Sequence, residues 1–301
     1  MMTYAVRRVP QVLPTLLLAS MLTFLLLRVV PGDIADVLAV QGAVSDESKA
    51  RIREQMGLDH SIPVQYVHWV GNLVSGNLGR SYWTNLPVTT LFGYAFPKTV
   101  QLGVAAMAVA LAIGVPLGVL AGAFRGSVFD HAATVLATLM ISVPTFAIGI
   151  LALLLFAVRL QWLPATGSLV LPALVLGVDI SGTLVRTLRS DIRSEMLADY
   201  VRTAHAKGLP RLRVLSRHVL PNSLTATITV MGLALGNLLG GTVIVESVFN
   251  WPGIGDLTIQ AIRNRDYPVV QAMVMVMTVA FVFVNLAVDL IYGLFDPRVR
   301  V

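Results

Sequence analysis

Apolar positions along this chain gather into six long runs, which are separated by more polar stretches. An α-helix rises 1.5 Å per residue, so about 20 residues cross the apolar core of a lipid bilayer. Each run reaches that length, and the pattern predicts an all-α polytopic membrane protein with about six transmembrane helices. The expected spans are residues 9–30, 99–123, 131–158, 169–188, 224–248 and 269–292.

Several features modify this picture of six plain spans. The first run is too long for a secretion signal and has no small-x-small cleavage site before the polar stretch, so it is interpreted as a retained span. Pro14, Pro116 and Pro144 lie inside the first three runs and predict kinks, because neighbouring helices can satisfy the carbonyls that a proline leaves free. The fourth run has the weakest pattern, since Pro172, Asp179 and Arg186 interrupt it.

The composition agrees with a membrane protein. Of the 301 residues, 56% are hydrophobic and 13% are charged, and the mean hydropathy is +0.77, whereas a soluble domain has roughly 25% charged residues. The net charge of +6 fits the basic residues that membrane proteins carry at the cytoplasmic face, so nucleic acid is not expected as a partner. The absence of cysteine excludes disulfides and thiolate metal sites in this chain.

The short loops between the runs predict an orientation. With the N-terminus inside, the inner segments are rich in arginine, whereas the short outer loops offer Arg159, Arg263 and Arg265. The positive-inside rule therefore predicts that both termini are cytoplasmic, with the loop at 31–98 discounted because the rule fades beyond about 60 residues. The expected units are a first segment and span at 1–30, an extracytoplasmic lobe at 31–98, a transmembrane core at 99–293 with a cytoplasmic loop at 189–222, and a cytoplasmic tail at 294–301.

The lobe at 31–98 is expected to be small and folded. Ser45 is a suitable N-cap for a helix through Met56, with Gly57 as its stop. The lobe also carries four aromatic residues that suit either anchoring at the lipid headgroups or contact with an external partner: Tyr66, Trp69, Tyr82 and Trp83. Further on, Trp251 is expected at an interface, and Asp256 is expected to cap a short outer helix that Pro268 ends.

The stretch 199–222 is a basic polar segment between apolar runs. It predicts two short helices, at about 200–207 and 210–218, with Gly208 in the left-handed position after the first and Pro210 in the first turn of the second. Its alternation of apolar residues with Arg211 and Arg213 also suits a helix lying on a lipid surface. The other interpretation is that this segment docks a soluble partner protein.

Charges inside the spans need partners or a polar environment. Asp179 lies nearest the middle of a span, where it suits either a transport pathway or a structural hydrogen bond. Glu246 and Asp289 lie near span ends, where contact with headgroups lowers the cost, so an interfacial structural role is expected for both.

A stripe of glycines in the fifth span predicts close helix packing. Gly232, Gly236 and Gly240 are spaced by four and share one helix face, which lets another backbone approach. The partner helix belongs either to this chain or to a second, homologous subunit.

The chain lacks the motifs of common enzymes. It contains no G-x-x-x-x-G-K-[ST] phosphate loop, no H-E-x-x-H zinc helix and no G-x-S-x-G nucleophile elbow. Its five histidines show no metal-ligand spacing. No catalytic residue and no metal site is therefore expected, and a membrane enzyme is disfavoured.

The stretch 199–222 resembles the EAA loop of the integral membrane subunits of ABC importers. That family pattern is E-A-A, three residues, G, nine residues and I-x-L-P. Here Arg202-Thr203-Ala204 stands at the first block, Gly208 at the glycine and His218-Val219-Leu220-Pro221 at the last block. The acidic residue and the isoleucine are replaced, and the form RTAHAKGL is similar to the dipeptide, oligopeptide and nickel permease branch.

Further blocks extend the resemblance over nearly the whole chain. They follow the order of that branch's subunit with the long first outer loop, and they include 31–33, 56–59, 76–81, 246–255, 265–268 and 296–298.

The resemblance implies a type I ABC importer permease for di- or oligopeptides in a bacterial or archaeal plasma membrane. It implies a second homologous permease subunit, two ATPase subunits or domains, an extracytoplasmic substrate-binding protein and surrounding lipid as partners. ATP and magnesium would then be bound by the ATPases, and this chain would bind no cofactor. Nickel chelates and glutathione are alternative substrates within the same architecture.

The same resemblance implies that the loop couples ATPase closure to the spans. Ala204 would keep the helix face flat, Gly208 would allow close approach, and Arg202, His205 and Lys207 would pair with carboxylates of the ATPase. The full expected coupling set is Arg202, Thr203, Ala204, His205, Lys207, Gly208, Leu209, Leu220 and Pro221. An ion-coupled secondary transporter is the alternative class, but Asp179 as a lone central carboxylate without evident repeats argues against it.

Overall fold

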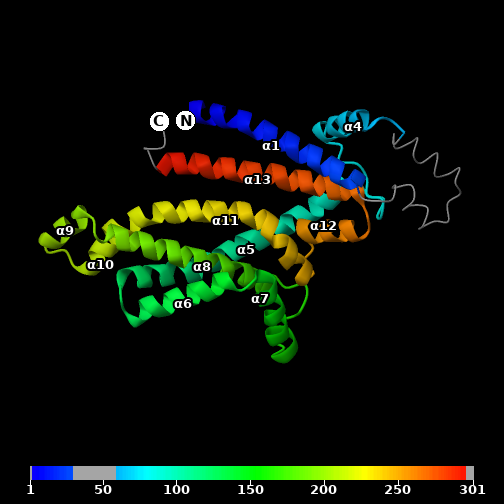
Figure 1. Ribbon diagram of the computed structural model, residues 1–301. Helices are drawn as coiled ribbons and strands as arrows, with labels where there is room; N and C mark the ends of the chain where they lie inside the picture. The colour runs from blue at the N-terminus through cyan, green and yellow to red at the C-terminus, as the bar shows by residue number, and fades with distance from the viewer. Residues whose placement is uncertain (1, 30–58, 296–301) are drawn as a thin grey trace.

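The described part of the chain is helical. The computed structural model describes residues 2–29 and 59–295, and these ranges contain helices, turns and one isolated bridge between Arg80 and Pro87. Figure 1 shows long helices side by side with shorter ones at the two ends of the bundle. The predicted all-α class is confirmed. The helices are α1 (Met2–Val29), α4 (Ile62–Val74), α5 (Val88–Ala123), α6 (Val128–Ser142), α7 (Thr145–Ala152), the π-helical η1 (Leu153–Arg159), α8 (Val170–Glu195), α9 (Asp199–Ala206), α10 (Arg211–Val214), the π-helical η2 (Leu215–Val219), α11 (Leu220–Val248), α12 (Ile254–Arg263) and α13 (Tyr267–Phe295).

Every predicted span contains a long helix or a broken one. Within the described residues, α5, α8 and the Tyr267–Ala287 part of α13 are long and apolar enough to cross a membrane alone. The pair formed by α6 and α7–η1 meets the same condition as one bent span. The helices α1 and α11, with 28 and 29 residues, rise about 42 and 44 Å, which exceeds the roughly 30 Å of a bilayer core.

The third span is broken, which corrects the expectation of a single kinked helix over 131–158. The two helical pieces are bent by 97° at the break, and Figure 1 shows α7 turning away from the bundle. Val143 is extended (φ −91°, ψ 126°) because the ring of Pro144 disfavours helical geometry in the residue before it. In α5, by contrast, the helix continues through Pro116.

A stripe of small residues brings α5 and α8 close together, and the sequence reasoning missed it. Gly114, Gly118 and Gly122 are spaced by four and lie buried on one face of α5. A Cβ atom added at these glycines would lie 2.9, 3.0 and 2.7 Å from the Cβ atoms of Leu184, Leu188 and Ile192 on α8. The two backbones can approach this closely only because the stripe carries no side chains.

The bundle has two distinct ends. Figure 1 shows the start of α1 and the end of α13 at the same end as α9 and α10, whereas α4 and α12 lie at the opposite end. We call these the α9 end and the α12 end. Both described chain ends therefore lie on the side of the 199–222 loop, as the predicted topology requires.

Contacts at the α12 end join segments that are distant in sequence. Val88 at the start of α5 packs in one apolar cluster with Ile254 of α12 and Met273 of α13. The buried Asp266 carboxylate accepts hydrogen bonds from the Ser81 hydroxyl (2.5 Å) and the Tyr82 backbone N–H (3.0 Å). The 76–81 and 265–268 blocks of the sequence thus meet in space.

Two of the lobe aromatics pack against the first span. The rings of Tyr66 and Trp69 lie 5.4 and 5.7 Å from the ring of Phe24 on α1, and the Tyr66 and Ser20 hydroxyls share a 2.7 Å hydrogen bond. Trp83, in contrast, is exposed. The predicted helix after Ser45, the 31–33 and 296–298 blocks and the Asp289 side chain lie outside the described residues.

Glu246 is fully buried, which corrects the expectation that it contacts headgroups at a span end. Its carboxylate accepts hydrogen bonds from the Thr99 hydroxyl (2.7 Å) and from the backbone N–H groups of Gly255 (2.7 Å) and Asp256 (3.3 Å). These N–H groups lie in the first turn of α12, where helical N–H groups lack intrahelical acceptors. Glu246 therefore fastens α12 to the end of α11.

The other expectations for this segment also change. Trp251 is buried and its indole N–H donates to the Lys98 carbonyl at 3.0 Å, so it does not lie at an interface. The N-cap of α12 is Gly253, while Asp256 lies within the first turn. Pro268 lies in the first turn of α13 and does not end α12, which stops at Arg263.

Candidate functional site

The helix α9 starts and stops where the sequence favours it. Its N-cap residue, Ala198, is extended, and Asp199 places a carboxylate in the first turn, where the helix dipole favours negative charge. At the other end Gly208 has φ +77°, and Leu209 N–H donates to the Ala204 carbonyl at 3.2 Å. This is the left-handed helix termination predicted for Gly208.

One face of α9 packs on the long helices. Val201 and Ala204 are buried in an apolar cluster with Leu188 and Ile192 of α8 and Val214 of α10. Ala204 thus faces the core of its own chain, which corrects the expectation that it flattens a surface for a partner. Leu209 and Leu220 pack against the same cluster.

The other face of α9 is exposed and basic. Arg202, Thr203, His205 and Lys207 are exposed, as is Gly208, and a Cβ added at Gly208 would meet nothing within 4 Å. Arg202 makes a 3.3 Å ion pair with Asp199, but both side chains are largely exposed, so the pair contributes little. The guanidinium remains available to an acidic partner.

The second predicted helix merges with the following span. Its first turn is α10, preceded by Pro210 as the N-cap, and the π-helical η2 then leads directly into α11. The helix therefore does not end at His218. Pro221 is exposed near the start of α11, directly after the π-helical η2.

Tyr200 links α9 to both neighbouring long helices. Its hydroxyl donates to the Glu195 carboxylate at the end of α8 and accepts from the Asn222 side-chain amide of α11 at 3.3 Å. Burial raises the pKa of the Tyr200 phenol, and the hydrogen bond to Glu195 raises it further, so the hydroxyl stays protonated. Side-chain hydrogen bonds of Tyr200 therefore connect α9 directly to α8 and α11.

Arg211 fastens α10 to a third long helix. Its guanidinium donates to the Ala123 carbonyl at the end of α5 and lies 5.6 Å from the centre of the Phe124 ring. The loop thus contacts the ends of α5, α8 and α11 together.

Asp130 forms a buried ion pair network at the same end, which the sequence reasoning missed. Its carboxylate accepts hydrogen bonds from Arg189 (2.6 Å), from Arg193 and from the backbone N–H of Gly126 (2.9 Å). Asp130 is 2% exposed, while the Arg189 and Arg193 side chains are 25% and 27% exposed, so a partly shielded network joins the start of α6 to the end of α8. The sequence signal was an acidic residue just before the third apolar run, together with the arginines that follow the fourth run.

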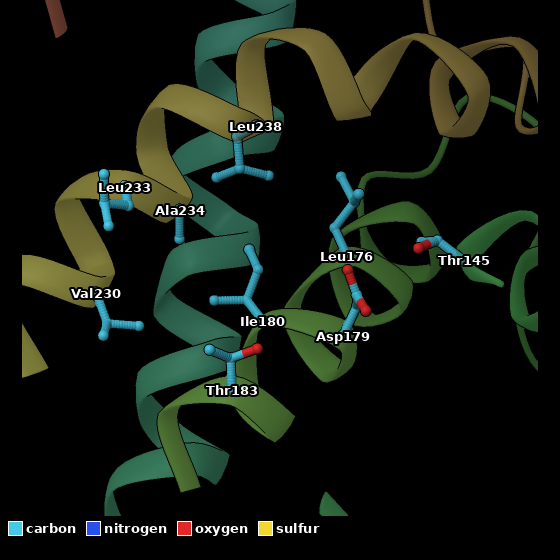
Figure 2. A pocket seen from close by; sticks show the side chains of 9 residues that line it. All are labelled: Thr145, Leu176, Asp179, Ile180, Thr183, Val230, Leu233, Ala234 and Leu238. Carbon is cyan, nitrogen blue, oxygen red and sulfur yellow. The ribbon is translucent and has the colours of Figure 1, made fainter. Parts of the chain in front are cut away.

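Asp179 lines a cavity between the long helices. Figure 2 shows its carboxylate and the Thr145 hydroxyl directed toward one another. The cavity has a volume of about 390 Å³, within the 300–1,000 Å³ of typical ligand pockets. Apart from one carboxylate and two threonines its lining is apolar: Thr145, Leu176, Asp179, Ile180, Thr183, Val230, Leu233, Ala234 and Leu238.

The glycines of α11 have different surroundings. Gly232 is buried, and a Cβ at Gly236 would lie 3.1 Å from Asn285 Oδ1 and 3.4 Å from the Phe281 ring on α13. Gly240 is exposed, and a Cβ there would meet nothing within 4 Å. Gly236 thus packs inside this chain, whereas Gly240 leaves an open surface. No cluster of three or more His, Cys, Asp or Glu side chains that could hold a metal occurs among the described residues.

Two family models match the chain. Residues 1–103 match the N-terminal part of a binding-protein-dependent transport system membrane component, and residues 114–301 match a binding-protein-dependent transport system inner membrane component.

Full-length relatives carry similar names. A putative peptide transport system permease protein of Brucella abortus is 40% identical, over 98% of this chain and 98% of its own. The di/tripeptide transport system permease of Pseudomonas aeruginosa is 37% identical, and the dipeptide transport system permease of Escherichia coli is 36% identical, each over 100% of this chain and 99% of its own.

Solved structures share the fold at low sequence identity. The inward-facing MetNI methionine ABC transporter aligns with a TM-score of 0.61 at 16% identity, over 68% of this chain and 96% of the other. An amino acid ABC transporter crystallised with histidines aligns with a TM-score of 0.55 at 16% identity, over 70% of this chain and 94% of the other. The helical arrangement is therefore that of ABC importer permeases.

Proposed function

We propose a function on the premise that this chain belongs to the family of binding-protein-dependent transport system inner membrane components. Members of this family are multi-pass inner membrane transport subunits and not enzymes. The peptide transport names of relatives that align over the full chain support a permease subunit of an ATP-driven importer of di- or oligopeptides.

The 199–222 loop is the coupling element of this importer. The observation that carries this assignment is that α9 exposes a basic face while Tyr200 and Arg211 tie the loop to α5, α8 and α11. Arg202, His205 and Lys207 would pair with carboxylates of an ATPase subunit. Closure of the ATPases would then displace α9, and the contacts of the loop would transmit this displacement to the long helices.

The cavity beside Asp179 is part of the transport pathway. It lies near the middle of α8 and α11, where a substrate passing between the two membrane faces must cross. Its mostly apolar lining suits varied peptide side chains, and its carboxylate gives one fixed polar contact.

The remaining parts of the importer follow from the same assignment. A second homologous permease subunit would complete the pathway, with the open surface at Gly240 as a candidate contact. Two ATPase subunits, which bind ATP and magnesium, would dock at the α9 end, and a substrate-binding protein would dock at the α12 end. The α9 end and both termini would then be cytoplasmic, in a bacterial or archaeal plasma membrane.

Uptake by the reconstituted complex tests this function. We expect radiolabelled dipeptide to accumulate in proteoliposomes only with binding protein outside and ATP inside. Accumulation without ATP that collapses with an ionophore would instead indicate an ion-coupled secondary transporter. ATP-driven uptake of a nickel chelate or of glutathione, without uptake of dipeptide, would support the ATP-driven importer but contradict dipeptide as its substrate.

A further inference from the structure

A second charged residue lies on the same face of α8 as Asp179. Arg186 follows Asp179 by seven residues, which turns the helix by two nearly complete turns and leaves the two side chains within about 20° of one face. Arg186 is exposed, and it makes no hydrogen bond or ion pair with another residue in the described ranges. Thr183, which lines the cavity, precedes Arg186 by three residues, so Arg186 lies about one helical turn beyond the cavity lining.

These two charges differ from the other charged cluster on this helix. Asp130 is closed off by Arg189 and Arg193, so that network is complete without a ligand. Asp179 and Arg186 are separated by about two turns, or about 10 Å along the axis. They present opposite charges on one face of α8.

We propose that Asp179 and Arg186 receive the two ends of a short peptide, the carboxylate of Asp179 binding its terminal ammonium and the guanidinium of Arg186 its terminal carboxylate. This inference rests on the proposed function and names its substrate class as zwitterionic peptides of two or three residues. An extended chain spans about 3.3–3.6 Å per residue, so three residues cover about 10 Å. The flexible arginine side chain accommodates the shorter dipeptide.

The polar groups around the cavity fit an ammonium. The Asp179 carboxylate and the Thr145 and Thr183 hydroxyls are oxygen acceptors that match an ammonium with three donors. The remaining lining is apolar, so it offers no polar side chain that would select particular peptide side chains.

Two rates measured on the reconstituted complex test the proposal. With binding protein present, we expect Asp179→Asn and Arg186→Gln to keep binding-protein-stimulated ATP hydrolysis but to lower the dipeptide transported per ATP at least tenfold. Asp179→Glu and Arg186→Lys, which keep the charges, should stay within about threefold of the wild type. Asp191→Asn is the matched control, because it removes a carboxylate of the same helix that does not line the cavity.

A charge-restoration experiment keeps the test independent of folding defects. The chain contains no cysteine, so Asp179→Cys can be modified in the assembled complex, with partner thiols blocked, by a thiol reagent that adds a sulfonate or by one that adds an ammonium. We expect only the sulfonate to restore transport per ATP. Equal results with both reagents, or an unchanged ratio in Asp179→Asn, would overturn the proposal. Absence of ATP-driven peptide uptake by the wild type would instead refute the proposed function.

Discussion

The carboxylate of Glu246 accepts a 2.7 Å hydrogen bond from the hydroxyl of Thr99, which joins the end of α11 to α5 across 147 positions of sequence. The same carboxylate accepts from the backbone of α12, and Thr99 in turn accepts from the Ile254 N–H at 2.8 Å. One buried carboxylate thus positions three helices at the α12 end. A small side chain placed against it should disturb all three.

Gly253→Ala should destabilise the protein by about 1–3 kcal/mol, because a Cβ there would lie 2.4 Å from the buried Glu246 carboxylate and the site is already fully packed. Thermal unfolding in detergent measures this effect as a lower Tm. Gly240→Ala is the control, since its Cβ would meet nothing within 4 Å. Equal Tm values for the two variants would contradict the packing described for Glu246.

Asp130→Ala should cost about 2–3 kcal/mol of stability, since it leaves the partly buried Arg189 and Arg193 without their shared carboxylate. Chemical unfolding of the purified protein measures the loss. Asp199→Ala, which removes an exposed carboxylate, should change stability by less than about 0.5 kcal/mol. A loss at Asp130 no larger than that of the control would show that the network contributes nothing.

Gly122→Leu should prevent α5 and α8 from packing, because a Cβ at this position already lies 2.7 Å from the Cβ of Ile192. We expect a loss of at least 3 kcal/mol, about the upper range for overpacking, and poor recovery of folded protein by size-exclusion chromatography. Gly103→Leu on the same helix is the control, because its Cβ would meet no atom within 4 Å. Normal recovery of both variants would refute the close contact.

The apolar runs predicted most of the fold, whereas contacts between distant segments could not be read from them. Gly208 was recognisable because a helix end beside a glycine is a local pattern, and its φ of +77° agrees. The break at Pro144 was underestimated, since the sequence does not reveal whether a proline sits in a continuous helix, as Pro116 does. The burial of Glu246 depends on Thr99, which no local pattern connects to it.

Prediction of the candidate sites had the same limit: local patterns were recognisable, whereas contacts between distant segments were not. The glycine stripe at Gly114, Gly118 and Gly122 has the same spacing as the predicted stripe on α11, but spacing alone does not say which stripe meets a neighbouring helix. The exposed face of α9 followed from its sequence pattern, while the inward position of Ala204 required the packing of α8 and α10.

Tyr200→Phe should weaken the transmission of movement from α9, because it removes the hydrogen bonds to Glu195 and Asn222 and keeps the exposed basic face. We expect normal retention of the ATPase subunits and about a threefold to tenfold lower yield of transported peptide per ATP. Simultaneous uptake and phosphate-release measurements give this ratio. Ser216→Ala, which removes an exposed hydroxyl of the same loop, should leave it unchanged, and an unchanged ratio in Tyr200→Phe would rule out the link.

Retention of the ATPase subunits by Gly208→Leu tests the coupling role of the 199–222 loop most directly. Gly167→Leu is the matched control, because Gly167 also has positive φ (+74°) and open surroundings but precedes α8 at the opposite end. Both variants bear similar backbone strain, about 1–2 kcal/mol. We predict that Gly208→Leu inserts normally but co-purifies at least tenfold less ATPase than Gly167→Leu, whereas equal co-purification and transport by the two variants would contradict the account.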